Sequence, residues 1–177
     1  MLRPAILYEE KLTTAMNYTW FDEKYKYYIA SQCNYEVRLK KDTVDSNQFV
    51  SILGDEVLGY IGFSIDRDIN SSYLIIINLS DHKSVFGQDV IQAVNDSFMK
   101  FRYDKLSFSV IIGNPVEKTY DRLIQQYGGR IVGTHRRDVR LIDGLLYDRK
   151  DYELFREDYI KNDKLIKYIE KKKSKAV

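Results

Sequence analysis

The sequence is poor in cysteine and in net charge, and each scarcity excludes a class of protein. Cys33 is the only cysteine among 177 residues, so an intrachain disulfide and a cysteine-based metal cluster are both excluded. Such use of cysteine fits a reducing compartment, and we expect a cytoplasmic protein. The 28 basic and 26 acidic residues give a formal net charge of only +2, which argues against a nucleic-acid partner.

Long apolar runs are also missing. No stretch approaches the roughly 18 apolar residues of a membrane-spanning helix, and the opening MLRPAILYEE lacks the apolar core of a signal peptide. We therefore expect no membrane partner. Only 2 prolines and no repeats occur, so no linker divides the chain. The hydrophobic content of 44% suffices for one domain, predicted over residues 1–160, with a solvated basic helix or tail over 161–177.

Residues 108–133 predict a strand, a helix and a second strand. The apolar run FSVII has the length of a buried strand, Gly113 interrupts it, and Asn114 opens a helix. Five residues of this helix recur with a period of 3.6 and predict one apolar face: Val116, Tyr120, Leu123, Ile124 and Tyr127. Gly128 and Gly129 end the helix, because glycine adopts the left-handed conformation of a helix C-terminus without steric cost.

Further strands follow from apolar runs and turn signals. The segments QFVSIL and VLGYIGFSID flank a Gly54-Asp55 turn and predict a hairpin. YLIIINLS is apolar enough to be a central strand that is buried on both faces. Segments 131–142 and 145–155 flank Asp143-Gly144, which is a strong signal for a two-residue hairpin loop.

The helix expected after the central strand carries a candidate anion site at its start. Its apolar face comprises Phe86, Val90, Ile91, Val94, Phe98 and Phe101, and we expect the helix to begin near Gly87. A helix N-terminus offers backbone N–H groups and the positive end of the macrodipole, so the loop over 83–89 is predicted to attract an anion. The alternative is an ordinary strand-to-helix junction that binds nothing.

The first 45 residues are irregular and rich in aromatic side chains. Arg3–Leu7 fits a short strand, Tyr8–Phe21 has helical composition, and Cys33–Arg38 fits either a helix end or a strand. Five aromatic residues either line a pocket for an acceptor or, as is more common for helical aromatics, belong to the core: Trp20, Phe21, Tyr25, Tyr27 and Tyr28.

This order of elements resembles the GNAT superfamily of N-acetyltransferases over roughly Arg3–Arg156, most closely from Gly59 onward. GNPVEKTY is similar to the family's Asn-led helix, YGGRIVGTHRRDVRLIDGLLYD to the Gly-ended helix and its following hairpin, and FGQDV to its phosphate loop. The resemblance implies an α/β (α+β) fold. Its mixed, mostly antiparallel sheet would be splayed into a V between the YLIIINL and SFSVII strands and flanked by helices.

The resemblance also implies that acetyl-coenzyme A lies in the V as the acetyl donor. Its pantetheine arm would pair with the backbone of the central strand, as an added strand would, and its pyrophosphate would contact the loop before the next helix. The cofactor-binding residues implied in this way are Asn78, Leu79, Lys83, Val85, Phe86, Gly87, Gln88, Asp89 and Asn114.

Two residues depart from the family's phosphate loop. Aligned on Gly87, Ser84 stands where the family has Arg or Gln, and Asp89 stands where it has Gly or Ala. Lys83 can still reach a phosphate, whereas a carboxylate at Asp89 repels one unless it turns away. We expect coenzyme A to bind with a micromolar dissociation constant, about −8 kcal/mol.

The reaction implied is direct transfer of the acetyl group to a primary amine, with no covalent enzyme intermediate. Tyr120 is the candidate proton donor to the departing thiolate, because the tyrosine reference pKa of about 10 roughly matches that of a thiol. The family has a tyrosine in this helix, which falls on Tyr120 when counted from Asn114 and on Ile124 when counted from Gly128. Tyr120 also lies on the apolar stripe, where it can simply be a core residue. A backbone N–H near Leu79 would polarise the thioester carbonyl.

The general base stays open. The candidates are a chain of water molecules or one of five side chains, namely Asp66, Asp81, Glu117, His82 and His135. No metal-ligand spacing, nucleophile motif or Walker sequence occurs, so no metal is predicted. The amine acceptor is not identified, and a homodimer is an open expectation. The alternative function is a catalytically weak GNAT fold that serves as a binding or structural module through its tyrosine-rich first third.

Overall fold

The computed structural model describes residues 1–17, 22–28, 39, 44–162 and 167. The predictions for Trp20, Phe21 and Cys33–Arg38, and those for most of the basic tail over 161–177, lie outside the described residues.

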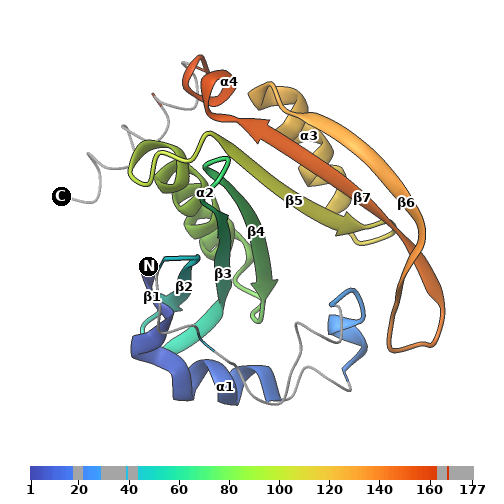
Figure 1. Ribbon diagram of the computed structural model, residues 1–177. Helices are drawn as coiled ribbons and strands as arrows, with labels where there is room; N and C mark the ends of the chain where they lie inside the picture. The colour runs from blue at the N-terminus through green and yellow to red at the C-terminus, as the bar shows by residue number, and fades with distance from the viewer. Residues whose placement is uncertain (18–21, 29–38, 40–43, 163–166, 168–177) are drawn as a thin grey trace.

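Within the described residues, seven strands form one sheet in the order β1-β2-β3-β4-β5-β7-β6 (Figure 1). Their bounds are Leu2–Pro4 for β1, Ser46–Leu53 for β2, Glu56–Asp66 for β3, Ser71–Asn78 for β4, Lys105–Ile111 for β5, Arg130–Arg140 for β6 and Leu146–Phe155 for β7. Every neighbouring pair is antiparallel except β4 and β5, which are parallel. The mixed, mostly antiparallel sheet that the sequence predicts is confirmed.

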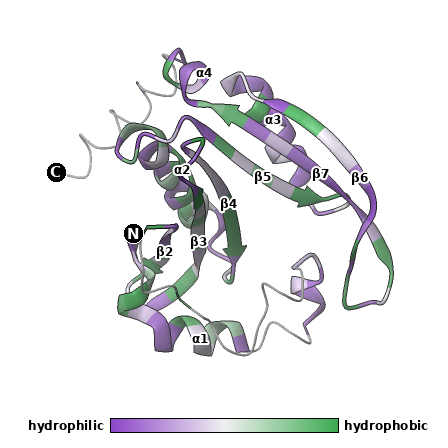
Figure 2. Cartoon of the chain, viewed as in Figure 1, coloured by the Kyte–Doolittle hydropathy of each residue, from purple (hydrophilic) through white to green (hydrophobic). Residues whose placement is uncertain are grey.

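The sheet splits between β4 and β5. These strands pair only at Ser71 with Lys105, Ser72 with Leu106 and Tyr73 with Ser107, and beyond that point they diverge (Figure 1). The predicted V is therefore present, with its closed end at the β3–β4 turn and its open end at the C-terminus of β4. Figure 2 shows that the second half of β4, which forms one wall of the V, is strongly hydrophobic.

Helices cover both faces of the sheet. Helices α2 (Lys83–Met99) and α3 (Glu117–Tyr127) pack on one face, in a core cluster that includes Leu74, Phe86 and Ile124. Helix α1 (Glu9–Asn17) packs on the other face, in a second cluster with Ile77. Successive side chains of a strand point to opposite faces, which explains why one apolar run serves both clusters. The remaining helical segments are η1 (Ala5–Tyr8), η3 (Glu23–Tyr25) and α4 (Arg156–Ile160).

The predicted ends of helix α3 and of the first hairpin are confirmed. Gly128 caps α3 with a left-handed backbone, φ 79°, and Gly54 lies in the β2–β3 turn with φ 59°. The second hairpin is also present, but β6 ends at Arg140 and β7 begins at Leu146, so its loop is longer than the two residues expected. Asp143 accepts the Leu145 N–H within this loop, which is how the longer turn is held.

Three predicted boundaries are wrong. Helix α3 begins at Glu117, three residues after Asn114, where the sequence predicts its start. Helix α2 begins at Lys83, one turn before Gly87, because a single glycine inside a helix costs only about 1 kcal/mol and does not stop it. The N-terminal strand ends at Pro4, and the residues after it, expected to continue the strand to Leu7, form the η1 turn.

Candidate functional site

An apolar pocket lies in the V on the side of α2 and α3. The space in and in front of the pocket, including the part that is open to solvent, is about 560 Å³. The walls include Leu74 and Ile76 from β4, Val90 and Val94 from α2, and Leu123 and Ile124 from α3. Strand β4 supplies one wall because its ladder with β5 has already ended, so no neighbouring strand covers that edge. The pocket therefore suits a slender ligand with an alkyl chain.

Tyr120 borders this pocket and is also part of the core beneath it. Its ring makes edge contacts with Phe108 and Tyr152, at centroid distances of 5.2 Å and 6.2 Å. Burial raises the pKa of the Tyr120 hydroxyl to about 12, and among the described residues this hydroxyl has no hydrogen-bond partner. Tyr120 is therefore protonated at neutral pH and able to donate, although it is a weaker acid than a free tyrosine.

A charged network lies beside Tyr120, between α3 and β7. The Lys150 ammonium is 2.5 Å from the Glu117 carboxylate and 3.2 Å from that of Asp121, which also accepts a 2.8 Å hydrogen bond from Tyr152. The hydrogen bond from Lys150 lowers the pKa of Glu117, and that from Tyr152 lowers the pKa of Asp121. Both carboxylates are thus held ionised, which makes them weak bases.

The other candidate bases are no better placed. A hydrogen bond from Lys24 lowers the pKa of Asp81. Asp66 pairs with Ser71 at the closed end of the V, far from the opening of the pocket. His82 lies 3.6 Å from Glu56 at the start of α2, and His135 contacts Asp151 at 2.8 Å on the β6–β7 hairpin. Among the described residues, no three His, Cys, Asp or Glu side chains are grouped to hold a metal ion.

Two tyrosines from the N-terminal third hold the end of β4. The Tyr28 hydroxyl donates to the Asn78 carbonyl at 2.6 Å and accepts the Asn78 N–H at 2.8 Å, while Tyr25 donates to the Leu79 carbonyl at 3.0 Å. The sequence singled out both tyrosines, but nothing local to them indicates these partners, which lie 50 and 54 residues away. Backbone groups alternate sides along a strand, so Ile76 presents its N–H and C=O on the same side as Asn78.

The amide of Leu79 faces the other way. Its N–H donates to the Leu58 carbonyl at 2.9 Å, on the β3 side of the strand. The Leu79 amide itself therefore does not polarise a thioester carbonyl, because its hydrogen is already used away from the V, and polarisation by another N–H near Leu79 stays a prediction.

The predicted phosphate loop is part of helix α2. Lys83, Val85, Phe86, Gly87, Gln88 and Asp89 all have helical backbone. The Lys83 amide donates to Asp81, and the amides of Val85 and Phe86 donate to His82. The expected loop of open N–H groups over these residues is therefore wrong, and only the first turn of α2, with exposed Lys83 and Ser84, can face an anion.

Asp89 turns away from the pocket, as it must if an anion is to approach α2. Its carboxylate accepts a 2.6 Å hydrogen bond from Ser51 and lies 2.9 Å from the Met1 ammonium, with only 15% of the side chain exposed. Asn114 is engaged locally as well, since its side-chain oxygen accepts the Val116 N–H at 3.1 Å before α3 begins.

The splayed sheet, with α2 and α3 beside its opening, matches the GNAT-like fold of solved acetyltransferase structures. No protein-family model and no curated protein sequence matches the chain. Among solved structures, one described as an inferred acetyltransferase aligns with a TM-score of 0.64 and 17% identity, over 93% of this chain and 87% of its own. Mutant forms of the spermidine/spermine N-acetyltransferase SpeG from Vibrio cholerae align with a TM-score of 0.58 and 20% identity, over 68% of this chain and 73% of the SpeG chain.

At these identities the likeness establishes the fold alone. In the part of the chain that the structure describes, no helix is long and apolar enough to cross a membrane.

Proposed function

We propose that the chain is an N-acetyltransferase that moves the acetyl group of acetyl-coenzyme A directly to a primary amine. The observation that carries the proposal is the split of the sheet, where β4 no longer pairs with β5 beyond Tyr73, beside an apolar pocket that Tyr120 borders. An arm of alternating amides and alkyl groups, such as pantetheine, could pair its amides with the backbone of β4 and place its alkyl groups against the apolar pocket.

The residues that would hold the coenzyme differ in part from those expected. The Ile76 backbone would pair with the arm, and Leu74, Val90 and Val94 would contact its alkyl groups. The first turn of α2, with Lys83 and Ser84, would face the pyrophosphate in place of a glycine loop. Fewer open N–H groups mean weaker binding, which supports the micromolar affinity expected.

The proposed reaction needs one side chain of this protein, Tyr120, as a proton donor. An acceptor amine loses a proton, its nitrogen attacks the thioester carbonyl carbon, and the carbon–sulfur bond breaks to release a thiolate that takes up a proton. Tyr120 donates a hydrogen bond, and then its proton, to that sulfur, and water returns a proton to the Tyr120 oxygen before the next turnover. The lowered pKa values of Glu117, Asp121 and Asp81 make these carboxylates weak bases, so the amine proton passes to water. We therefore expect the rate to rise with pH toward the pKa of the acceptor amine.

The test has two parts. Calorimetry of the whole chain with coenzyme A should give a micromolar dissociation constant, and thiol release from acetyl-coenzyme A should respond to a pool of amines. Polyamines belong in the first pool, because SpeG is a spermidine/spermine N-acetyltransferase of the same fold. An absence of heat at millimolar coenzyme would overturn the proposal.

A binding module is the second candidate, and one observation favours it. Tyr28 already occupies the backbone of Asn78, where the coenzyme was expected to pair. If coenzyme A does not bind, the β4 backbone stays occupied by Tyr28, and the chain would act as a binding module and not as an enzyme.

A further inference from the structure

The segment Asp22–Tyr28, here called the tyrosine strap, lies between the two arms of the V at its open end (Figure 1). It is a compact unit. Asp22 accepts the Tyr25 N–H at 2.9 Å through its carbonyl and the Lys24 N–H at 2.8 Å through its side chain, and Tyr28 donates its N–H to the Tyr25 carbonyl at 2.8 Å. The strap therefore has hydrogen bonds of its own that do not depend on either arm.

One side of the strap is fixed to the β4 arm. The rings of Tyr25 and Tyr28 stack at a centroid distance of 5.5 Å, and their hydroxyls bind the backbone of Leu79 and Asn78. Lys24 adds an ion pair with Asp81 at 3.0 Å, in the loop that follows β4.

The other side of the strap is fixed to the β6–β7 arm. The Tyr27 ring meets the Tyr147 ring edge-on at 6.3 Å, within an apolar cluster that contains Ile111, Val139 and Leu141. The Lys26 ammonium lies over both rings, at 5.4 Å and 5.5 Å, and 3.5 Å from the Asp143 carboxylate. The strap thus connects two arms that otherwise diverge.

The Tyr28 hydroxyl makes the pair of hydrogen bonds that a ligand amide would make. It donates one hydrogen bond and accepts another from the same residue, Asn78, past the end of the β4–β5 ladder. A coenzyme arm that pairs along β4 through Ile76 reaches Asn78 two residues later, on the same side of the strand. The arm and the hydroxyl cannot hold Asn78 together.

We propose that the tyrosine strap is a built-in competitor of the coenzyme, an inference that rests on the proposed function. Tyr28 must release Asn78 before the pantetheine arm pairs with it, so coenzyme binding and release of the strap from β4 are one coupled event. The observed affinity is then the intrinsic affinity multiplied by the fraction of molecules whose strap is released. The strap thereby keeps the open end of the V covered until the donor is in place.

Tyr28→Phe tests the competition directly, because it removes the hydroxyl and keeps the ring that stacks on Tyr25. Calorimetry should show coenzyme A bound about 3- to 30-fold more tightly, which corresponds to the loss of one or two ordinary hydrogen bonds from the strapped state. The matched control is Tyr27→Phe, in the same strap, whose hydroxyl makes no hydrogen bond among the described residues. Its affinity should equal that of the unmodified protein.

Hydrogen exchange of the Asn78 amide gives a second readout that needs no coenzyme. The amide should exchange faster in Tyr28→Phe than in Tyr27→Phe, and added coenzyme A should slow it in both variants. Equal or weaker coenzyme binding in Tyr28→Phe overturns the competition and makes Tyr28 part of the binding wall. Failure of all three proteins to bind coenzyme overturns the proposed function itself, while the exchange rates still report whether Tyr28 guards Asn78.

Discussion

Asp89 on helix α2 accepts a hydrogen bond from Ser51 on strand β2, and the two oxygens lie 2.6 Å apart in a largely buried contact. The carboxylate therefore joins the helix to the sheet and does not face the V. Asp89→Ala should lower the free energy of unfolding by about 1–3 kcal/mol, because it leaves the buried Ser51 hydroxyl unpaired. Urea denaturation measures this loss. A gain in coenzyme affinity without loss of stability would instead place the carboxylate against the phosphates.

The apolar face of α3 should show graded costs. Ile124 is only 4% exposed and lies in the main core, so Ile124→Ala should cost about 2–5 kcal/mol. Leu123 borders the pocket and is partly exposed, so Leu123→Ala should cost less, about 1–2 kcal/mol. Urea denaturation of both variants checks the order of the two free-energy losses. A larger loss for Leu123→Ala would show that Leu123, and not Ile124, faces the core.

Tyr120→Phe should separate catalysis from stability. The hydroxyl has no hydrogen-bond partner in the described chain, so its removal should leave the free energy of unfolding nearly unchanged. If Tyr120 protonates the thiolate, kcat should fall by about 10- to 10⁴-fold while coenzyme affinity stays the same. Thiol-release kinetics measure kcat.

Tyr152→Phe is the matched control for Tyr120. Its hydroxyl donates to Asp121 in the core beneath the pocket, and the variant should lose stability by about 1–3 kcal/mol without a comparable fall in kcat. Unchanged turnover in Tyr120→Phe would leave Tyr120 as a core residue alone.

The network around Lys150 should make stability depend on acid. The pKa values of Glu117 and Asp121 are lowered in the folded protein, so their stabilisation is present above the unfolded carboxyl pKa of about 4 and is lost as the pH falls through the lower folded values. Hydrogen bonding to Glu117 raises the pKa of Lys150, whose contribution is lost only as the pH rises beyond about 10.4. Between these limits the network is fully formed.

Thermal melts of the unmodified protein and of Glu117→Gln check this window. The Tm difference between them should be largest near neutral pH and shrink as the pH is lowered from about 5 to about 2, where both carry a neutral group at this position. A difference that stays constant across this range would show that the ion pair is not what Glu117 contributes.

The sequence predicts the fold well because the fold depends on local signals. The period of 3.6 over 116–127 and the glycine at 128 define helix α3, and the alternating hydrophobic strands define the sheet. The start of α2 expected near Gly87 is wrong because the helix accommodates this glycine in its second turn. Nothing near Gly87 in space requires a glycine, since a Cβ there would meet no atom within 4 Å.

The site is less predictable because its contacts join distant parts of the chain. Tyr28 and Asn78 are 50 residues apart, and Ser51 and Asp89 are 38 apart. Periodicity cannot indicate which hydroxyl or carboxylate will meet which backbone group at such separations. The family resemblance placed the coenzyme in the V, but it gave no sign that this chain covers part of β4 with its own tyrosine.

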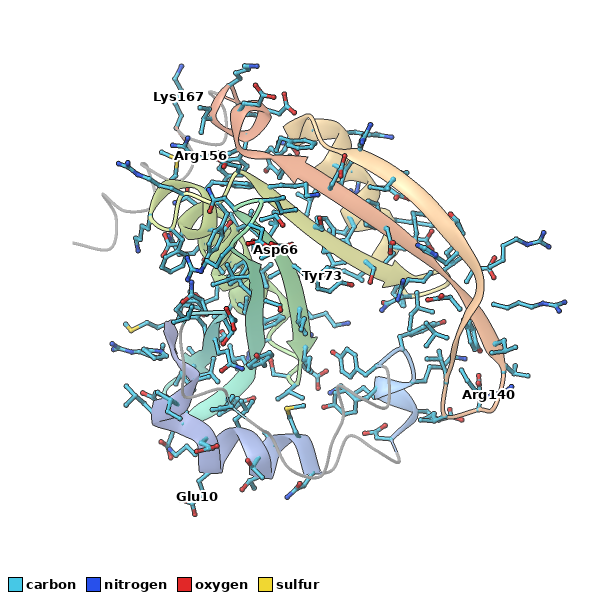
Figure 3. All side chains as sticks on the ribbon, in the orientation of Figure 1. Glu10, Asp66, Tyr73, Arg140, Arg156 and Lys167 are labelled. Carbon is cyan, nitrogen blue, oxygen red and sulfur yellow. The ribbon has the colours of Figure 1, made fainter. Side chains whose placement is uncertain are left out.

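The closed end of the V, where β4 and β5 still pair, has a consequence for how the two arms can move. The hydroxyls of Tyr73 and Ser109 hydrogen-bond at 2.6 Å just where the ladder between β4 and β5 ends, and Figure 3 shows Tyr73 reaching from β4 toward β5. This hydrogen bond and the tyrosine strap connect the two arms of the V at its closed end and at its open end, respectively. A ligand that displaces the strap therefore frees the two arms at the open end only. At the closed end, the Tyr73–Ser109 hydrogen bond still holds β4 against β5.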